Sequence, residues 1–267
     1  YLTAVLTDLD ACRRVAYENV EDAKAEGIDY IELRFSPWFM AETNGLEAEG
    51  VVEAVADGII AGERDTGVRA QAIGIMSRTY DTETCHRELD ALLAHRDHLA
   101  AIDLAGDEQK FPAHRFHEHF KRARDAGLQV TVHAGEVEGP WSIWDAIREL
   151  GATRIGHGIH CLEDPALVEY LVDNRIGLEI SMTSNVHIGV VDDYAGHPVK
   201  QILEQGVLAN LNTDDPAISG IDLRHEFEVV APKAGLSAAQ ARKAQENGLE
   251  MAFLSSQEKA GLRLKKR

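Results

Sequence analysis

Four residues that could bind a metal ion or move a proton stand at the ends of apolar segments. His133 and Glu136 lie in the string HAGE, His157 lies in GHG, and Asp214 lies in NTDDP. A histidine and an aspartate make half of a metal site, and a catalytic zinc usually takes three protein ligands and keeps one position open for water. Bound zinc lowers the pKa of that water to roughly 7, which gives a hydroxide nucleophile. A nearby glutamate could carry a proton, and a second histidine could orient the hydroxide.

Each of these motifs also has a structural explanation when it stands alone. A histidine at a strand end more often makes a structural hydrogen bond, and Asp-Asp-Pro commonly starts a turn. Gly-His-Gly is a weak signal for the same reason. The combination is stronger, because polar groups of this kind end three otherwise apolar segments. The residues alone therefore leave a metal site and a set of structural turns as alternatives.

Seven short segments could position these groups, and helical patterns alternate with them. The segments are apolar on both faces and rich in Ile, Val and Leu, which is typical of parallel strands buried between two layers. Strands that alternate with helices indicate βαβ units. A glycine before several of these strands can take the positive φ that ends a helix. The segments span 28–36, 68–77, 100–106, 129–135, 154–158, 176–185 and 207–216, and the glycines are Gly27, Gly67, Gly127, Gly151 and Gly206.

Polar and ionisable residues gather at the carboxyl ends of most of these segments. Several strands that contribute to one face are typical of a (β/α)₈ barrel, whereas an open doubly wound sheet concentrates its site at one switch point. We therefore expect an α/β fold, a single (β/α)₈ TIM-barrel domain over residues 1–267 without its first strand. The chain opens at Tyr1 and soon enters a helical pattern, so we expect that strand upstream.

The composition excludes several classes of protein. The chain has 267 residues, 27 of them Lys or Arg and 45 of them Asp or Glu, which gives a formal net charge of −18. That excess argues against a nucleic-acid partner and against an anionic membrane surface. No segment approaches about 18 consecutive apolar residues, so we expect no membrane span. Three scattered cysteines indicate a reducing, cytoplasmic location instead of a disulfide framework.

The motifs taken together resemble the adenosine deaminase family of metal-dependent amidohydrolases. The strings TVHAGE, RIGHG, SMTSN, LNTDDP and DLAGDE (103–108) carry the resemblance, which runs from Leu9 to Lys259. ELRFSP (32–37), GIMSR (74–78) and NGLEMAF (247–253) are similar to bacterial adenosine deaminases in particular. The resemblance implies a (β/α)₈ barrel, one zinc ion, and hydrolytic removal of the 6-amino group of adenosine or deoxyadenosine. A purine nucleoside is thus the expected partner, and the oligomeric state is left open.

The resemblance also implies a role for each matching residue. His133 and Asp214 would be zinc ligands, and His157 would hold and polarise the attacking hydroxide. Glu136 would protonate the purine N1 as hydroxide attacks C6. Because this acid must carry a proton, we expect the pKa of Glu136 to be raised in the substrate-bound site.

Further positions would bind the purine or orient the metal site. Asp215 would form a hydrogen bond with the purine N7, and Gly106 would offer its backbone amide to N3. Asp103 would orient groups near the metal. Ser184 and Asn185 either line the pocket or form a turn after a strand.

The sequence departs from the family at the metal site. The family also binds zinc through a His-X-His pair at the end of its first strand, and the chain contains no such strand. The string His117-Glu118-His119 lies in a helical pattern. On a helix, side chains at i and i+2 point about 200° apart, so this pair cannot chelate one ion. The chain thus supplies at most two of the four expected protein ligands. Either the segment with the other ligands was omitted, or the chain is a metal-free remnant, and we expect omission.

Two other functions stay open. The first is a deaminase for adenine or another 6-aminopurine, which would use the same metal chemistry. The second is a catalytically silent nucleoside-binding protein on the same scaffold. The H-x-E…P-C-x-x-C signature of zinc-dependent cytidine deaminases is absent, as are the GxGxxG and GxxxxGK[ST] motifs of nucleotide-binding folds.

Overall fold

A computed structural model describes residues 2–265 of the chain and divides them into two compact units. Unit 1 contains the residues up to Phe111, Arg115–Val130, and the residues from Leu262 onward. Unit 2 contains Pro112–His114 and Thr131–Gly261. The expectation of one barrel domain over residues 1–267 stays a prediction.

Unit 1 contains parallel strands that follow one another in chain order. Strands β1 (Tyr30–Phe35), β2 (Arg69–Ser77) and β3 (Leu99–Ala105) pair in that order, and the first two residues of β4 (Gln129–Ala134) pair with β3. The helical segments of this unit are η1 (Leu2–Val5), α1 (Leu9–Ala25), α2 (Pro37–Glu42), α3 (Ala48–Thr66), α4 (Thr82–Ala94), η2 (Arg96–His98) and α5 (His117–Asp125). Two further segments, η3 (Ala113–Phe116) and α14 (Ser256–Lys265), have residues in both units.

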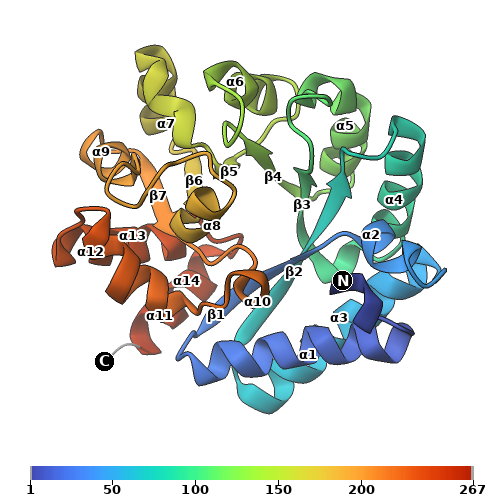
Figure 1. Cartoon of the computed structure of the whole chain (residues 1–267). Coiled ribbons are helices and arrows are strands. Elements are labelled where there is room, and N and C mark those ends of the chain that lie inside the picture. Colours follow the sequence, from blue (N-terminus) through green and yellow to red (C-terminus); the bar gives the residue numbers. More distant parts are fainter. Residues whose placement is uncertain (1, 266–267) are drawn as a thin grey trace. The chain divides into compact units, whose positions relative to one another are not determined.

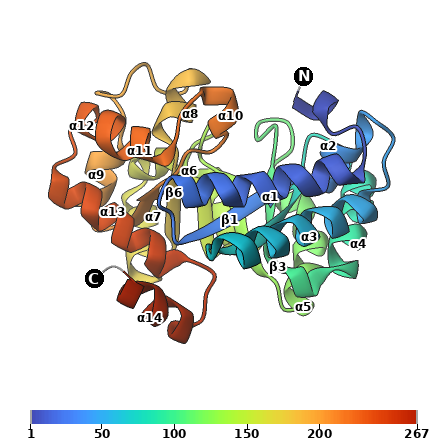
Figure 2. The same cartoon turned by 90° about the horizontal axis from the view of Figure 1, so that it is seen from below.

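Helices α1 and α3 lie side by side in both views of the structure (Figures 1 and 2). Helix α1 begins after Asp8, whose side chain accepts a hydrogen bond from the N–H of Ala11 at 2.8 Å. The close approach needs glycine on α3, since a Cβ at Gly58 would lie 2.2 Å from the carbonyl oxygen of Arg13. The small residues of α3 therefore determine how closely α1 packs.

Unit 2 continues the same alternation. The last four residues of β4 pair with β5 (Arg154–His157), which pairs with β6 (Gly177–Ile180), which pairs with β7 (Leu208–Leu211), all in parallel. Helices α9 and α13 pack against β7 (Figure 1). The helical segments of this unit are α6 (Pro140–Arg148), η4 (Ile159–Glu163), α7 (Pro165–Asp173), α8 (Met182–His187), α9 (Val199–Glu204), α10 (Pro216–Ser219), α11 (Leu223–His225), the π-helix η5 (Glu226–Val230), α12 (Ala231–Lys233) and α13 (Ala238–Met251).

The predicted strands agree with the observed ones in number and position. Every residue of β5 and β6 is buried, as expected for strands covered on both faces. All five glycines predicted to precede strands have a positive φ, between 72° at Gly67 and 88° at Gly127. Two predicted strands were too long, since residues 182–187 form helix α8 and β7 ends at Leu211. Among residues 2–265, no helix has both the length and the low polarity that a membrane span requires.

Candidate active site

The carboxyl ends of three strands of unit 2 bring together two histidines and an aspartate. His133 is the fifth residue of β4, His157 ends β5, and Asp214 follows β7. One ligand atom from each lies within 4.8 Å of the others. The two imidazole centroids are 5.2 Å apart, and His157 Nε2 lies 4.0 Å from Asp214 Oδ2. The predicted convergence of these three side chains is therefore present.

The backbone is unusual at two of these positions. His157 has a φ of 63° and Asp214 a φ of 58°, both in the left-handed region that residues other than glycine rarely adopt. Such conformations persist where the surrounding structure enforces them, and they cluster at functional sites. The left-handed residue ends β5 at His157, whereas Asp214 lies three residues after the end of β7.

The donor set of this cluster suits a divalent metal. Two imidazole nitrogens and a carboxylate oxygen are the ligand types of catalytic zinc, which keeps a further position for water. Ser184 supports the aspartate, because its hydroxyl donates a hydrogen bond of 2.7 Å to Asp214 Oδ2. A hydrogen-bond donor that contacts a ligating carboxylate holds it in the orientation that the metal needs. The residues present therefore fit a metal site.

Glu136 lies beside the cluster and contacts His157. Its Oε1 is 3.2 Å from His157 Nδ1, and its side chain is 18% exposed, so it is reachable from solvent. The turn that leads to Glu136 needs Gly135, which has a φ of 65° and whose Cβ would lie 2.5 Å from Ile143. A carboxyl group that can donate a proton, Glu136, thus lies next to a histidine that can orient a nucleophile, His157.

Asp215 follows the cluster residue Asp214 directly. Desolvation by the surrounding atoms, and then the negative charge of Asp214, raise the pKa of the Asp215 carboxyl, while His133 opposes the rise. The Asp215 carboxyl therefore keeps its proton to a higher pH than a free aspartic acid does.

Asn185 and His197 belong to the same site, and sequence reasoning missed the second of them. Asn185 Nδ2 donates to Glu136 Oε1 at 3.0 Å and lies 3.1 Å from His157 Nδ1. His197 Nε2 lies 3.2 Å from Asn185 Oδ1. Both side chains are buried, at 0% and 4% exposure. The sequence left Asn185 between a pocket residue and a turn residue, and it contained no signal at His197, which lies in a polar stretch.

Two predicted site residues, Asp103 and Gly106, belong to unit 1. Asp103 is fully buried and accepts a hydrogen bond of 2.9 Å from Arg34 Nη1. Gly106 has a φ of 107°, and a Cβ there would lie 2.4 Å from Thr79 Oγ1. Their predicted roles toward the metal and the purine stay predictions.

The structure places the His-X-His string on a helix, as predicted. His117 begins helix α5, and His119 is buried, with its ring stacked on His86 at 3.7 Å between centroids. In the part of the chain that the structure describes, neither His117 nor His119 belongs to a group of three residues able to hold a metal.

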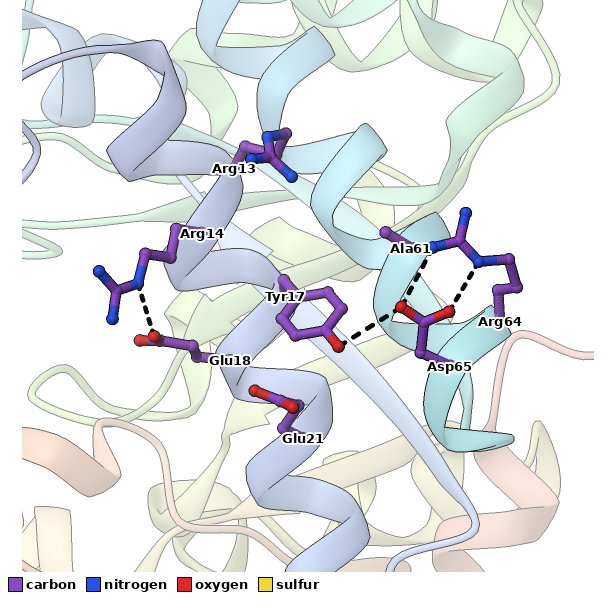
Figure 3. A pocket seen from close by; sticks show the side chains of 8 residues that line it. All are labelled: Arg13, Arg14, Tyr17, Glu18, Glu21, Ala61, Arg64 and Asp65. Carbon is purple, nitrogen blue, oxygen red and sulfur yellow. Dashed lines mark hydrogen bonds and ion pairs between the residues drawn. The ribbon is translucent and has the colours of Figure 1, made fainter.

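A separate surface depression of about 310 Å³ lies between α1 and α3 (Figure 3). Two pairs of its charged groups form ion pairs, Arg14 with Glu18 and Arg64 with Asp65. The hydroxyl of Tyr17 points toward Asp65 across the depression. No predicted site residue lines it, so it does not compete with the cluster of unit 2.

Comparisons with known proteins identify the family to which the chain is similar. The model of the adenosine deaminase family matches residues 1–265. The adenosine deaminase of Vibrio parahaemolyticus is 62% identical over 262 residues, which cover 98% of this chain and 78% of that protein.

Two solved structures share the fold. The crystal structure of adenine deaminase from Arthrobacter aurescens has a TM-score of 0.90 at 30% identity, over 95% of this chain and 77% of that chain. An amidohydrolase from Burkholderia ambifaria, solved with bound zinc, has a TM-score of 0.91 at 26% identity, over 97% of this chain and 72% of that chain. Together with the parallel strands in chain order, these likenesses confirm the predicted (β/α)₈ fold class, with seven strands among residues 2–265.

Proposed function

The chain belongs to the adenosine deaminase family, and from this membership we infer that it hydrolyses adenosine and deoxyadenosine to inosine and deoxyinosine with release of ammonia. The observation that carries the inference is the 62% identity to a curated adenosine deaminase over nearly the whole chain. The convergence of His133, His157 and Asp214 also supports it, because these side chains could hold the metal ion that such a hydrolysis uses.

We propose zinc as the metal, with His133 and Asp214 among its ligands. Bound there, it would supply a hydroxide nucleophile at neutral pH. The nitrogen and oxygen donors of the cluster and the zinc in the Burkholderia relative support this choice. The hydrogen bond from Ser184 would hold the Asp214 carboxylate in a ligating orientation.

The remaining residues of the cluster would handle protons. We propose that Glu136 gives a proton to the purine N1 while the nucleophile attacks C6, and that His157 orients the nucleophile. Protonation of N1 matters because it lets the ring accept electrons as its aromaticity is broken. The 3.2 Å contact between Glu136 and His157 supports a shared site for the two groups.

Asp215 and Gly106 would recognise the purine, and Asp103 would orient groups near the metal. The purine N7 only accepts hydrogen bonds, so Asp215 would have to donate one, and the raised pKa of its carboxyl is compatible with that form. Gly106 would offer its N–H to N3, and the clash that a Cβ would make with Thr79 supports a need for glycine there. Asp103 is held by Arg34 in a fixed orientation.

Two properties of the protein in the cell follow as proposals. We expect a small purine nucleoside as the partner, and neither nucleic acid nor a membrane. We also propose a cytoplasmic location, which the three free and buried cysteines Cys12, Cys85 and Cys161 support.

The test compares substrates on a protein of measured intact mass and metal content. Loss of the adenosine absorbance band is followed with zinc and with a chelator, for adenosine, deoxyadenosine and adenine. We expect zinc-dependent turnover of both nucleosides and much slower turnover of adenine. A preference for adenine would favour the function of the Arthrobacter relative, and no turnover with zinc bound would favour a silent nucleoside-binding protein.

A further inference from the structure

A chain of hydrogen bonds in unit 2 runs from a backbone N–H to the candidate general acid. The N–H of Val199, at the start of α9, donates to His197 Nδ1 at 3.1 Å. His197 Nε2 lies 3.2 Å from Asn185 Oδ1. Asn185 Nδ2 then donates to Glu136 Oε1 at 3.0 Å and lies 3.1 Å from His157 Nδ1. All of these contacts are buried except the bond from Asn185 to Glu136, which is partly buried, so water competes little with them.

The first donor determines the direction of every later bond. A backbone N–H can only donate, so His197 Nδ1 must accept, and the proton of a neutral His197 must be on Nε2. Nε2–H therefore donates to Asn185, which places the oxygen of that amide toward His197. A flipped amide would set two N–H donors of Asn185 and His197 against each other.

The surroundings of His197 keep it in this neutral form. Burial, and then the nearby His157, lower the pKa of His197 to about 4. At neutral pH the ring therefore has one proton and one lone pair, as the chain of bonds requires.

We propose that His197 is a positioning residue that acts through Asn185 and places the acidic proton of Glu136 on Oε2. The proposal rests on the proposed function. The amide nitrogen of Asn185 can only donate, so Glu136 Oε1 is held as an acceptor. In a carboxylic acid the carbonyl oxygen is the better acceptor, so Oε1 is the carbonyl oxygen and Oε2 carries the proton. When that proton moves to the purine N1, the Oε2–H bond breaks, the N1–H bond forms, and the electron pair stays on the carboxylate, where the N–H of Asn185 stabilises the charge.

The same amide also contacts His157. Asn185 Nδ2 lies 3.1 Å from His157 Nδ1, and Glu136 Oε1 lies 3.2 Å from the same nitrogen. The orientation of Asn185 therefore determines which groups surround both Glu136 and His157.

The kinetic test uses two substitutions of similar size at one position. His197→Met removes the donor at Nε2, whereas His197→Gln keeps an N–H at that position. We expect His197→Met to lower kcat about tenfold to a hundredfold with little change in KM, and His197→Gln to restore most of it. The matched control is His119→Met, which removes another buried histidine whose Nε2 bonds to the carbonyl of Thr82, and which should leave kcat unchanged.

A double substitution separates positioning from packing. In the background of Asn185→Ala, His197→Met should lower kcat no further, because the residue through which His197 acts is gone. If the double variant lost the product of the two single losses of kcat, the two residues would act independently and the proposal would be overturned. Equal losses of kcat in His197→Met and His197→Gln would also overturn it.

A readout without activity completes the test. Nitrogen NMR of ¹⁵N-histidine-labelled, metal-free protein at pH 7 should show a neutral His197 that is protonated on Nε2. A proton on Nδ1 of His197, or a charged His197, overturns the proposal without any variant having to fold. If the wild-type protein failed to deaminate adenosine, the proposed function would fall, while these spectra would still decide the orientation of Asn185.

Discussion

The carboxylate of Glu226 accepts a hydrogen bond from the backbone N–H of Thr183 at 3.2 Å, although 43 residues separate the two positions. Thr183 lies in the first turn of α8, where backbone N–H groups have no partner within the helix. Glu226 lies in the π-helix η5 and is fully buried. The helix that holds Ser184 and Asn185 is therefore anchored from a distant part of unit 2.

We expect Glu226→Ala to weaken both stability and catalysis. The substitution leaves the N–H of Thr183 buried without its acceptor, which should lower the free energy of unfolding by about 1–3 kcal/mol. Movement of α8 should also shift Ser184 and Asn185 and lower kcat. Urea unfolding and steady-state kinetics check this, with the exposed Glu228→Ala as the control in the same π-helix. Wild-type stability in Glu226→Ala would show that the bond does not anchor the helix.

A second buried carboxylate, Glu88, makes stability depend on pH. Burial raises the pKa of Glu88 to about 7, although its side chain accepts hydrogen bonds from Ser36, Trp38 and Ser77. The folded protein thus holds a proton that the unfolded chain releases near pH 4.5. The stability that this proton confers is therefore lost as pH rises from about 4.5 to about 7, by an amount on the order of 3 kcal/mol.

Glu88→Gln should remove this contribution to the pH dependence. The net charge of −18 adds a pH dependence of its own, so the informative quantity is the difference in unfolding free energy between the variant and the wild type. That difference should change between pH 5 and pH 7.5 in the direction that favours the variant at the higher pH. Glu83→Gln changes an exposed position of the same helix, and its unfolding free energy should depend on pH as that of the wild type does. The same dependence on pH in Glu88→Gln and the wild type would refute the raised pKa of Glu88.

The strands and the chemical residues at their ends were predictable because their signals are local. Alternation of apolar strands and helices indicated the βαβ order, and a polar residue after an apolar strand indicated the face where His133, His157 and Asp214 meet. No tertiary contact was needed to infer either feature.

Helix α8 and the role of His197 were not predictable from local pattern, for a shared physical reason. The first turn of α8 obtains an acceptor from Glu226, and the string around Ser184 continues an apolar strand without any break. His197 gains its role from contacts with Val199 and Asn185, which form only in the folded chain. Asp103 and Gly106 were predicted from the family resemblance alone, and their roles stay predictions.

Gly106→Ala tests the proposed amide contact with the purine. The φ of 107° is strained for alanine, and its Cβ would meet Thr79 Oγ1 at 2.4 Å, so the backbone must move. We expect kcat/KM for adenosine to fall at least tenfold, mainly through KM, because a displaced N–H binds N3 poorly. Gly45→Ala is the control, since Gly45 also has a positive φ but no atom lies within 4 Å of its Cβ site. Equal kinetics for the two variants would remove Gly106 from the purine site.

Glu136→Gln tests the general acid. Glutamine keeps the shape and can still accept from Asn185 at Oε1, but it has no acidic proton to give to N1. General acid catalysis contributes about 10²- to 10⁴-fold, so kcat should fall by that order while zinc content stays equal to that of the wild type. Glu138→Gln, two residues away and hydrogen-bonded to Trp141, is the matched control and should keep full activity.

The pH dependence of the same variant identifies the form of Glu136 that acts. An acid works only while it is protonated, so the wild-type kcat should fall as pH rises through the pKa of Glu136 in the substrate complex. A raised pKa moves that decline toward neutral pH, and Glu136→Gln should lose the decline together with the rate. Near-full activity with an unchanged pH profile in Glu136→Gln would mean that another group protonates N1. The orientation of Asn185 would then concern His157 alone.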